Sequence, residues 1–406
     1  MLRNTCIQGV LDTDFYKLTM LQAYQRLVPN QASEWTFQCR NDEDLTPYLE
    51  LMREELAGLA RMSISLPELK AFSRSATGFS PDFLEFLYHF RFDPALIETR
   101  VQGSRLHLSV QGPLFQASML EIPVLATLSE LRNTIRYPEI DAALIEKVTL
   151  QRIADLQRLG DDTDLSEFRF AEFGTRRRFS FAAQKQVLGL LKQHVPQCLL
   201  GTSNPLLAQH YALPLIGTMG HEWLQSYQGL DLPLAASQKQ ALAQWLMVYP
   251  QGGVALTDVI GIEAFCRDLD FTLANQYSGF RHDSGDPIAW GETLLARLEA
   301  LGVDPLTKTL VFSDGLDFTR AVALYRHFRG RARCSFGIGT WLTGNFELNR
   351  PLNCVLKMVR FNGHSVAKIS DSPAKNVCRD PRFLQQLMDA FAVSQGVRQQ
   401  IMSQLT

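Results

Sequence analysis

From about residue 165 onward, short apolar runs typical of β-strands alternate with amphipathic helical segments. The apolar runs are 168–173, 198–200, 213–217, 253–257, 310–312 and 334–336. Strands separated by helices of about 10–15 residues are typical of the βαβ units that build a parallel sheet. A series this long favours a closed or distorted barrel over an open sheet. We therefore predict an α/β fold whose central part, residues 136–349, is an irregular, TIM-like parallel α/β barrel that carries the active site.

The N-terminal part of the chain follows a different pattern. Leu11–Val28 is predicted to form a helix that is capped by Asp12 or Thr13 and ended by Pro29. Two apolar rows run along this helix, which implies burial on more than one side. Residues 31 to about 130 mix helical pieces with short alternating strands, a combination that indicates an α+β domain.

A hairpin signal marks the C-terminal part. Val355–Phe361 and His364–Ile369 flank Asn362-Gly363, a dipeptide that strongly favours a type I′ turn between antiparallel strands. Because a hairpin does not extend a parallel barrel, we expect this tail to return to the N-terminal segment. The predicted second domain is therefore an α+β domain formed by residues 1–135 and 350–406.

Composition excludes several classes of protein. The 406 residues are 46% hydrophobic and 20% charged, which is enough apolar material for a large core. No apolar run approaches the roughly 18 residues of a membrane span, and the N-terminus lacks the order of a secretory signal. A net charge of −2 gives no field to hold nucleic acid. Seven scattered cysteines without a CxxC pair predict reduced thiols and a cytoplasmic location.

Small and polar residues follow nearly every strand predicted in the second half of the chain. They are Gly174–Arg178, Gly201–Asn204, Gly217–His221, Thr257–Asp258, Arg281–Asp286, Ser313–Gly315 and Gly337–Thr340. In a parallel βα array these segments lie on one face, at the carboxyl ends of the strands, where such folds build their active sites. So many on one rim predict a functional site there.

The residue types on this rim indicate the substrate. Arg176–Arg178 and Arg281 can bind anions through bidentate donors, and Gly337–Thr340 offers backbone N–H groups to a phosphate. Carboxylates suited to Mg²⁺ or to ribose hydroxyls are supplied by Asp283, Asp286 and Asp314. Together these residues predict a phosphorylated sugar bound with Mg²⁺. His221 is then a candidate nucleophile or proton carrier.

Each of these features also has a purely structural explanation. Arg176–Arg178 could form a solvated face, and Gly337 and Gly339 could be turn glycines. Asp286 precedes a proline and resembles an N-cap followed by the first residue of a helix. Tyr16 lies on an apolar helical row, where a core position is the more common outcome. It is their joint placement that favours the functional interpretation.

Six motifs stand out along the chain. They are Leu-Asp-Thr-Asp-Phe-Tyr-Lys-Leu-Thr-Met at 11–20, Glu-Phe-Gly-Thr-Arg at 172–176, Gly-Thr-Ser-Asn at 201–204, Gly-Thr-Met-Gly-His-Glu-Trp at 217–223, Arg-His-Asp-Ser-Gly-Asp at 281–286 and Phe-Gly-Ile-Gly-Thr at 336–340. In type and order they resemble the motif set of the nicotinate phosphoribosyltransferase family, and the resemblance covers almost the whole chain. It implies an irregular α/β barrel with a second α/β domain built from both chain ends.

The same resemblance implies a reaction. Nicotinate and 5-phosphoribosyl 1-pyrophosphate would give nicotinate mononucleotide and pyrophosphate, coupled to ATP hydrolysis, on the salvage route to NAD. His221 would be the residue that ATP phosphorylates, with Mg²⁺ and arginines stabilising the transferred phosphoryl group. We expect Asp258, at the neighbouring strand end, to orient the imidazole, and Asp283 to complete the catalytic set.

Further substrate contacts follow from the resemblance, residue by residue. Tyr16 and Phe173 would stack on the two faces of the pyridine ring. The remaining contacts would be Thr218 and Arg281 with nicotinate, Arg176 with a nearby anionic group, Asn204 with the substrate, Asp283 and Asp314 with ribose hydroxyls or Mg²⁺, and Gly339 and Thr340 with the 5-phosphate. In the related nicotinamide enzyme the counterpart of Tyr16 comes from the partner subunit, so the resemblance also implies a homodimer with shared sites. The two apolar rows of the first helix are the support for a dimer within the sequence itself.

Three alternatives remain open at this stage. The nearest is a nicotinamide-type enzyme of the same fold, which has an aspartate at the position of Asn204; an uncharged Asn204 favours an acidic substrate. A sugar-phosphate lyase would need a lysine at a strand's carboxyl end, whereas Lys357 lies in a predicted antiparallel strand. A non-catalytic nucleotide sensor would bind the sugar phosphate without releasing pyrophosphate.

Overall fold

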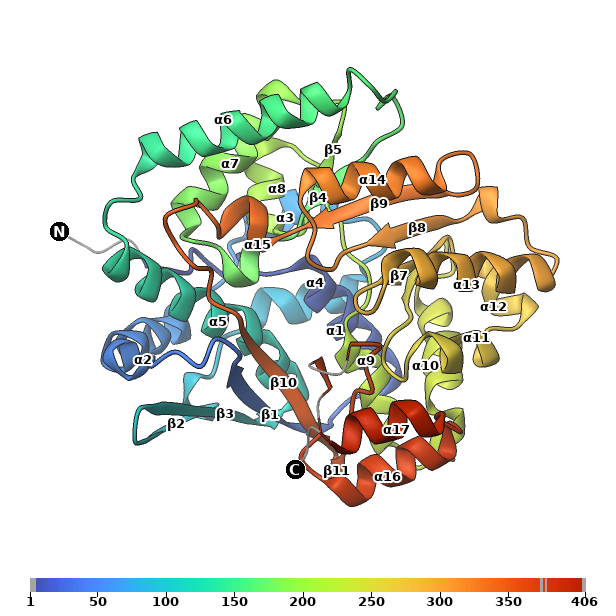
Figure 1. Ribbon diagram of the computed structural model, residues 1–406. Helices are drawn as coiled ribbons and strands as arrows, with labels where there is room; N and C mark the ends of the chain where they lie inside the picture. The colour runs from blue at the N-terminus through green and yellow to red at the C-terminus, as the bar shows by residue number, and fades with distance from the viewer. Residues whose placement is uncertain (1–4, 373–374, 377, 404–406) are drawn as a thin grey trace.

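The computed structural model describes residues 5–403 except 373, 374 and 377. Its central sheet is parallel, and its strands are β4 (Phe170–Glu172), β5 (Leu199–Thr202), β6 (Val254–Leu256), β7 (Gly279–His282), β8 (Thr309–Phe312) and β9 (Arg333–Ile338). They lie in the order β5-β4-β9-β8-β7-β6 (Figure 1). The last strand of the series, β9, therefore pairs with the first, β4, as in a barrel.

The barrel is incomplete on one side. A single parallel bridge from Thr202 to Leu215 continues the sheet beyond β5. Between Leu215 and β6 no strand pairing is present among the described residues. The predicted irregular parallel α/β barrel is confirmed, and its open side is the stretch that leads into His221.

Helices alternate with these strands, and short polar side chains start several of them. They are α6 (Ala142–Leu159), α7 (Phe181–His194), α8 (Pro205–Tyr211), α9 (His221–Ser226), α10 (Ser237–Val248), α11 (Ile262–Asp268), α12 (Phe271–Gln276), α13 (Pro287–Ala300), α14 (Phe318–Phe328) and α15 (Thr340–Thr343). Ser180, Asn204, Asp286 and Asp317 each accept a backbone N–H of the helix that follows. Some polar residues after the strands are therefore helix caps.

A second sheet is antiparallel and joins the two ends of the chain. Its strands are β1 (Ala32–Cys39), β2 (Ile97–Gln102), β3 (Arg105–Pro113), β10 (Cys354–Phe361) and β11 (His364–Ser365), in the order β11-β10-β1-β3-β2. Asn362 and Gly363 have φ of 50° and 79°, the left-handed pair that a type I′ turn requires. The C-terminal tail thus returns to the N-terminal segment as predicted, because β10 pairs with β1.

Seven helices accompany this sheet or follow it. They are α1 (Phe15–Leu27), α2 (Leu49–Ala57), α3 (Leu66–Ser75), α4 (Pro81–His89), α5 (Leu114–Arg136), α16 (Pro381–Ala390) and α17 (Gln395–Met402). By length and composition α5 is able to cross a membrane, but 83% of its most apolar window is buried inside the fold, as in the core helix of a globular domain. The last helices also contact the barrel half, since Arg267 donates to the carbonyl of Phe391 at 2.5 Å.

The start of α1 differs from the prediction. The helix begins at Phe15 with Asp14 at the N-cap position, two residues later than a cap at Asp12 would place it. Asp12 is not free to cap it, because its carboxylate accepts two bonds from Arg178 at 2.6 and 2.8 Å.

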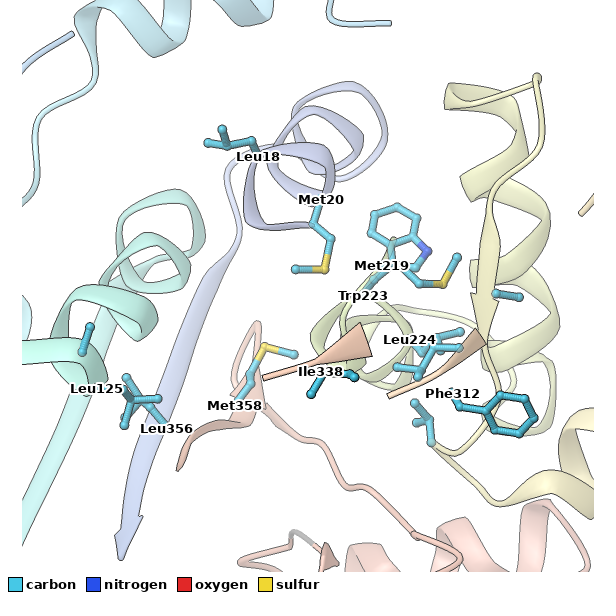
Figure 2. Close-up of a cluster of buried hydrophobic side chains, with 14 of the residues drawn as sticks. Leu18, Met20, Leu125, Met219, Trp223, Leu224, Phe312, Ile338, Leu356 and Met358 are labelled. Carbon is cyan, nitrogen blue, oxygen red and sulfur yellow. The ribbon is translucent and has the colours of Figure 1, made fainter. Parts of the chain in front are cut away.

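The two halves of the molecule share one hydrophobic core. Figure 2 shows Met20 of α1 between Trp223 of α9 and Met358 of β10, with Ile338 of β9 close to Met358 and Leu18 on the other side of α1. All five side chains are buried. Because burying one such side chain stabilises a fold by about 1.5–3 kcal/mol, this shared core holds the antiparallel sheet against the open side of the barrel.

Candidate active site

A cavity of about 680 Å³ lies where the two halves meet. The barrel rim supplies most of its wall, at the carboxyl ends of β4, β7, β8 and β9. The other half contributes side chains from both chain ends, namely Asp14, Tyr16, Trp35, Arg40, Glu121, Lys357, Lys368 and Lys375. A cavity of this size is typical of sites for small-molecule substrates.

Most of the residues predicted from the sequence line this cavity. They are Tyr16, Phe173, Arg176, Thr218, His221, Arg281, Asp283, Asp314, Gly339 and Thr340. The turns after the strands therefore converge on one place, as the sequence predicted. Asp258 lies just behind the wall, bonded to His221.

Asn204 is not among the residues that line the cavity. Its side chain is buried, its amide donates to Asp12 Oδ1 at 2.8 Å, and its oxygen caps α8 by accepting the N–H of Leu207 at 3.0 Å. The neighbouring Ser203 lines the cavity instead. In this structure the Asn204 side chain fixes the backbone, and its contact with the substrate stays a prediction.

Asp286 is a second predicted site residue that has a structural role. It is exposed, it lies outside the cavity, and it caps α13 by accepting the N–H of Ala289 at 2.8 Å. The capping alternative is confirmed, while the role as a metal ligand stays a prediction. Of the predicted carboxylates, Asp283 and Asp314 remain in the cavity.

His221 is held between two carboxylates. Its Nε2 lies 2.9 Å from Asp258 Oδ1 and 3.5 Å from Asp283 Oδ2. Asp258 is in turn fixed from its other oxygen, which accepts bonds from Ser284 Oγ and Lys368 Nζ, each at 2.6 Å. A carboxylate held from both sides keeps the imidazole in one orientation.

Burial sets the protonation state of His221. Burial first, and the charge of Lys368 in addition, lower the pKa of the imidazole to about 4. Asp258 and Asp283 act in the opposite direction and raise the pKa. Although burial opposes it, Lys368 and His221 hold the pKa of Asp258 well below its usual range. At neutral pH a neutral imidazole therefore faces an ionised carboxylate. Because that carboxylate can only accept, we assign the proton to Nε2, which leaves the lone pair on Nδ1.

Asp283 and Asp314 can hold a hard cation. Burial raises the pKa of Asp283, but His221, Arg281 and Lys368 outweigh it and lower the pKa to about 2, so this carboxylate is ionised at neutral pH. Asp283 Oδ1 accepts one long bond from Ser313 at 3.3 Å. Oxygen donors of this kind suit Mg²⁺.

Cationic donors surround the rest of the cavity. Arg281 Nη1 donates to Thr218 Oγ1 at 3.0 Å, while its buried Nε has no hydrogen-bond partner among the described residues. Arg176 lies 3.6 Å from Glu121, and Arg40 also has a buried Nε without a partner in the described part of the chain. A buried donor without a partner is costly unless a ligand satisfies it. These guanidinium groups are therefore suited to an anionic ligand.

Two glycines of the rim make room for Phe173. A Cβ on Gly337 would lie 2.4 Å from the Phe173 ring, and one on Gly339 would lie 2.7 Å from the Phe173 carbonyl oxygen. The glycine-rich turn thus allows the aromatic side chain to occupy the cavity wall. Its predicted role in holding a phosphate stays a prediction for Gly339 and Thr340.

Comparisons with known proteins agree with this geometry. The model of the nicotinate phosphoribosyltransferase (NAPRTase) family matches residues 168–395, and that of the NAPRTase N-terminal domain matches residues 11–129. The chain belongs to the nicotinate phosphoribosyltransferase family. The fold, the cavity and the six motifs are accordingly those of a NAPRTase family member.

Relatives of known name match over their whole length. The chain is 47% identical to nicotinate phosphoribosyltransferase 2 of Pseudomonas aeruginosa, over 96% of this chain and 98% of the relative. It is 44% identical to nicotinate phosphoribosyltransferase of Photorhabdus laumondii, over 96% and 97%. The crystal structure of nicotinate phosphoribosyltransferase from Vibrio cholerae superposes with a TM-score of 0.94 at 36% identity, covering 100% of this chain and 99% of that one.

In this member of the family one chain supplies Tyr16 to its own cavity. The ring lies against Gly220, where a Cβ would be 3.0 Å from Tyr16 Cε2. Tyr16 thus lines the cavity of its own chain, a point that the sequence left open. The two apolar rows of α1 are also covered within the chain, since Leu18, Met20 and Leu21 are buried. The first helix therefore gives no support to a dimer.

Three lysines of the NAPRTase cavity were not predicted to belong to the site. Lys368 bonds to Asp258, and Lys375 donates to the carbonyl of Asp283 at 2.7 Å and pairs with Asp314 at 2.5 Å. Lys357 lines the wall, where burial first, and the charges of Arg176 and Lys368 in addition, lower its pKa to about 7. A lysine inside an otherwise apolar strand was the available signal for Lys357. Lys368 lies in the second strand predicted for the hairpin and Lys375 follows it, and neither gave a signal.

Proposed function

We propose that the chain is a nicotinate phosphoribosyltransferase that converts nicotinate and 5-phosphoribosyl 1-pyrophosphate to nicotinate mononucleotide and pyrophosphate. The proposal rests on family membership together with one observation. A neutral, carboxylate-oriented imidazole opens into the same cavity as Tyr16, Phe173, Arg176 and Arg281. An aromatic pair beside guanidinium groups suits a planar aromatic acid, because a ring stacks and a carboxylate accepts bidentate bonds.

The residues of the cavity have separate roles in the transfer of the phosphoribosyl group. The pyridine nitrogen of nicotinate attacks C1 of the ribose, the C1–O bond to pyrophosphate breaks, and pyrophosphate leaves. We infer that Tyr16 and Phe173 align the ring, and that Arg281 with Thr218 holds its carboxylate. Because positive charge develops on C1 while an anion departs, catalysis consists of positioning and charge stabilisation with little proton transfer.

We propose that ATP phosphorylates His221. The Nδ1 lone pair attacks the γ-phosphorus, an N–P bond forms, and ADP leaves; water later hydrolyses the phosphohistidine to phosphate. Asp258 keeps the Nε2 proton and balances the positive charge of the phosphorylated ring. Mg²⁺, for which Asp283 and Asp314 are the fitting ligands, would neutralise charge on the phosphates. Phosphorylation would favour a binding-competent conformation and thus product formation.

The cellular setting extends this proposal. We infer that the chain acts in the cytoplasm on the salvage route to NAD, since family membership and its unpaired cysteines fit that location. A homodimer is implied by the family resemblance alone. Light scattering of the pure protein at several concentrations would distinguish a dimer from a monomer.

The substrate class is tested directly with the pure protein. Nicotinate, nicotinamide and quinolinate are each incubated with the pyrophosphorylated sugar and Mg²⁺, with and without ATP, and the nucleotide and pyrophosphate are quantified. We expect product from nicotinate, and more of it with ATP. Efficient use of nicotinamide in place of nicotinate would assign the chain to the amide-specific enzymes, and absence of pyrophosphate release with any of the three would contradict catalysis.

A further inference from the structure

Two cysteines lie directly opposite each other on neighbouring strands beside the cavity. Cys39 ends β1, Cys354 begins β10, and the register of the two strands pairs them. Arg40 and Asn353 are the next pair along the ladder, and the backbone N–H of Arg40 donates to the carbonyl of Asn353 at 2.9 Å. Because bonded and non-bonded pairs alternate along an antiparallel ladder, Cys39 and Cys354 form a non-hydrogen-bonded pair, for which the Cα atoms are about 4.5 Å apart. That spacing lies within the range of about 4.4–6.8 Å that a disulfide can bridge.

The two thiols are chemically unlike. A hydrogen bond from the Cys354 thiol is the largest cause that lowers the pKa of Cys39 to about 6, and backbone N–H groups at Glu43 and Asn41 lower it further against the effect of burial. The same bond, followed by burial, raises the pKa of Cys354 far above its usual range. Cys39 is partly exposed, whereas Cys354 is buried. Cys39, the more accessible thiol of the pair, is therefore the one that ionises first.

The other five cysteines lack this arrangement. Burial raises the pKa of every one of them, namely Cys6, Cys198, Cys266, Cys334 and Cys378. All are free thiols, and none is paired with another cysteine in the strand registers of the described residues. Because the thiolate is the reactive form of cysteine, Cys39 is the site at which an oxidant should react first.

We propose that Cys39 and Cys354 are a modification site, at which a low-molecular-weight disulfide oxidises the pair to a reversible intramolecular disulfide. The Cys39 thiolate attacks one sulfur of the small disulfide, the S–S bond breaks, and one small thiolate leaves. Cys354 then loses its proton and attacks the Cys39 sulfur of the mixed disulfide, which releases the second small thiol. The two protein thiols give up two electrons, and the small disulfide takes them up as two thiols.

The crosslink would join the two ends of the chain at the cavity wall. Arg40 follows Cys39, and Asn353 and Val355 flank Cys354; all three line the cavity. Arg177, another lining residue, donates to the carbonyl of Cys354 at 3.0 Å. The modification site is independent of the proposed reaction, because its chemistry needs no substrate.

Peptide mapping of the full chain tests this site. The reduced protein is treated with oxidised glutathione, free thiols are blocked with an alkylating agent, and the digest is analysed by mass spectrometry. We expect a Cys39–Cys354 crosslinked peptide that disappears after reduction with dithiothreitol. The matched control, Cys334→Ser, should give the same crosslink in the same yield as the wild type.

Two single variants separate the roles of the pair. In Cys354→Ser we expect the glutathione adduct to accumulate on Cys39, because the resolving thiol is missing. In Cys39→Ser we expect neither adduct nor crosslink at Cys354. The wild-type digest alone can overturn the proposal. It does so if Cys39 and Cys354 both stay alkylated, or if all seven cysteines gain adducts equally.

Discussion

The state of a single residue, His221, shows how burial and charge compete in this site. Two carboxylates face its ring, at 2.9 Å for Asp258 and 3.5 Å for Asp283, and both favour a protonated imidazole. Burial and the charge of Lys368 nevertheless keep the pKa near 4. The ring is therefore a nucleophile at neutral pH, which is what a phosphoryl acceptor must be.

Replacing Lys368 with methionine should shift the acid limb of ATP hydrolysis. In the wild type the imidazole becomes protonated, and stops acting as a nucleophile, as the pH falls toward the pKa of about 4. Removing the nearby cation raises that pKa, so the loss of activity should begin about one pH unit higher. The measurement is kcat for ATP hydrolysis across the acid range. Lys239→Met, which removes an exposed partner of Asp270, is the control, and an unmoved limb in Lys368→Met would contradict the assignment.

Replacing Arg281 with alanine should impair the use of nicotinate. The guanidinium is fixed by Thr218 and has a buried donor available, so its loss removes a charge-assisted bond to the substrate carboxylate. Such bonds contribute about 1.5–3 kcal/mol, which corresponds to roughly 10- to 100-fold in kcat/KM. The control is Arg331→Ala, which removes an exposed arginine that pairs with Glu292. This variant should leave kcat/KM unchanged. An unaffected Arg281→Ala would move the carboxylate contact to another residue.

At the scale of elements, a buried ion pair determines where α1 begins. Arg178, directly after the turn that follows β4, binds the carboxylate of Asp12 with two bonds, and both side chains are fully buried. Arg178 also donates to the carbonyl of Cys6 at 2.7 Å. This contact fixes the N-terminal segment to the barrel and so places Tyr16 in the cavity.

Replacing Arg178 with methionine should destabilise the fold strongly. The change leaves Asp12 buried without its countercharge, and breaking such a pair on one side costs about 3–5 kcal/mol of the free energy of unfolding. Urea denaturation followed by circular dichroism measures the effect. Arg53→Met, which removes an exposed arginine paired with Glu50, should cost less than about 1 kcal/mol. Equal stability of the two variants would show that the Asp12–Arg178 pair does not anchor the segment.

Sequence patterns located the elements better than they located the side chains. The βαβ series, the Asn362-Gly363 turn and the rim positions followed from local periodicity and turn chemistry, which neighbouring residues determine. The sequence could not show that Asn204 and Asp286 cap helices, because a helix cap and a substrate ligand both place a short polar residue after a strand. Lys368 escaped notice because its partner, Asp258, lies 110 positions away in the chain. Such contacts exist only once the tail has folded back.

At the scale of the whole molecule, the site exists because two halves cover one another. The barrel is open between Leu215 and β6, and the antiparallel sheet brings Lys357 and Arg40 to the cavity from opposite ends of the chain. The shared core of Figure 2 holds this arrangement. Catalytic groups from the rim and cations from the tail therefore meet around His221. We infer that His221 is the phosphoryl acceptor.

Mapping the phosphoryl group is the most direct measurement of this claim. The protein is incubated with Mg²⁺ and ATP labelled in the γ-phosphate, and the labelled peptide is identified under alkaline conditions that preserve phosphohistidine. We predict one label, on His221, which is absent in His221→Ala together with the ATP stimulation of product formation, while slow ATP-independent transfer remains. His210→Ala, which changes an exposed histidine of α8, should label as the wild type does. A label on any other residue, or full ATP coupling in His221→Ala, would contradict the account.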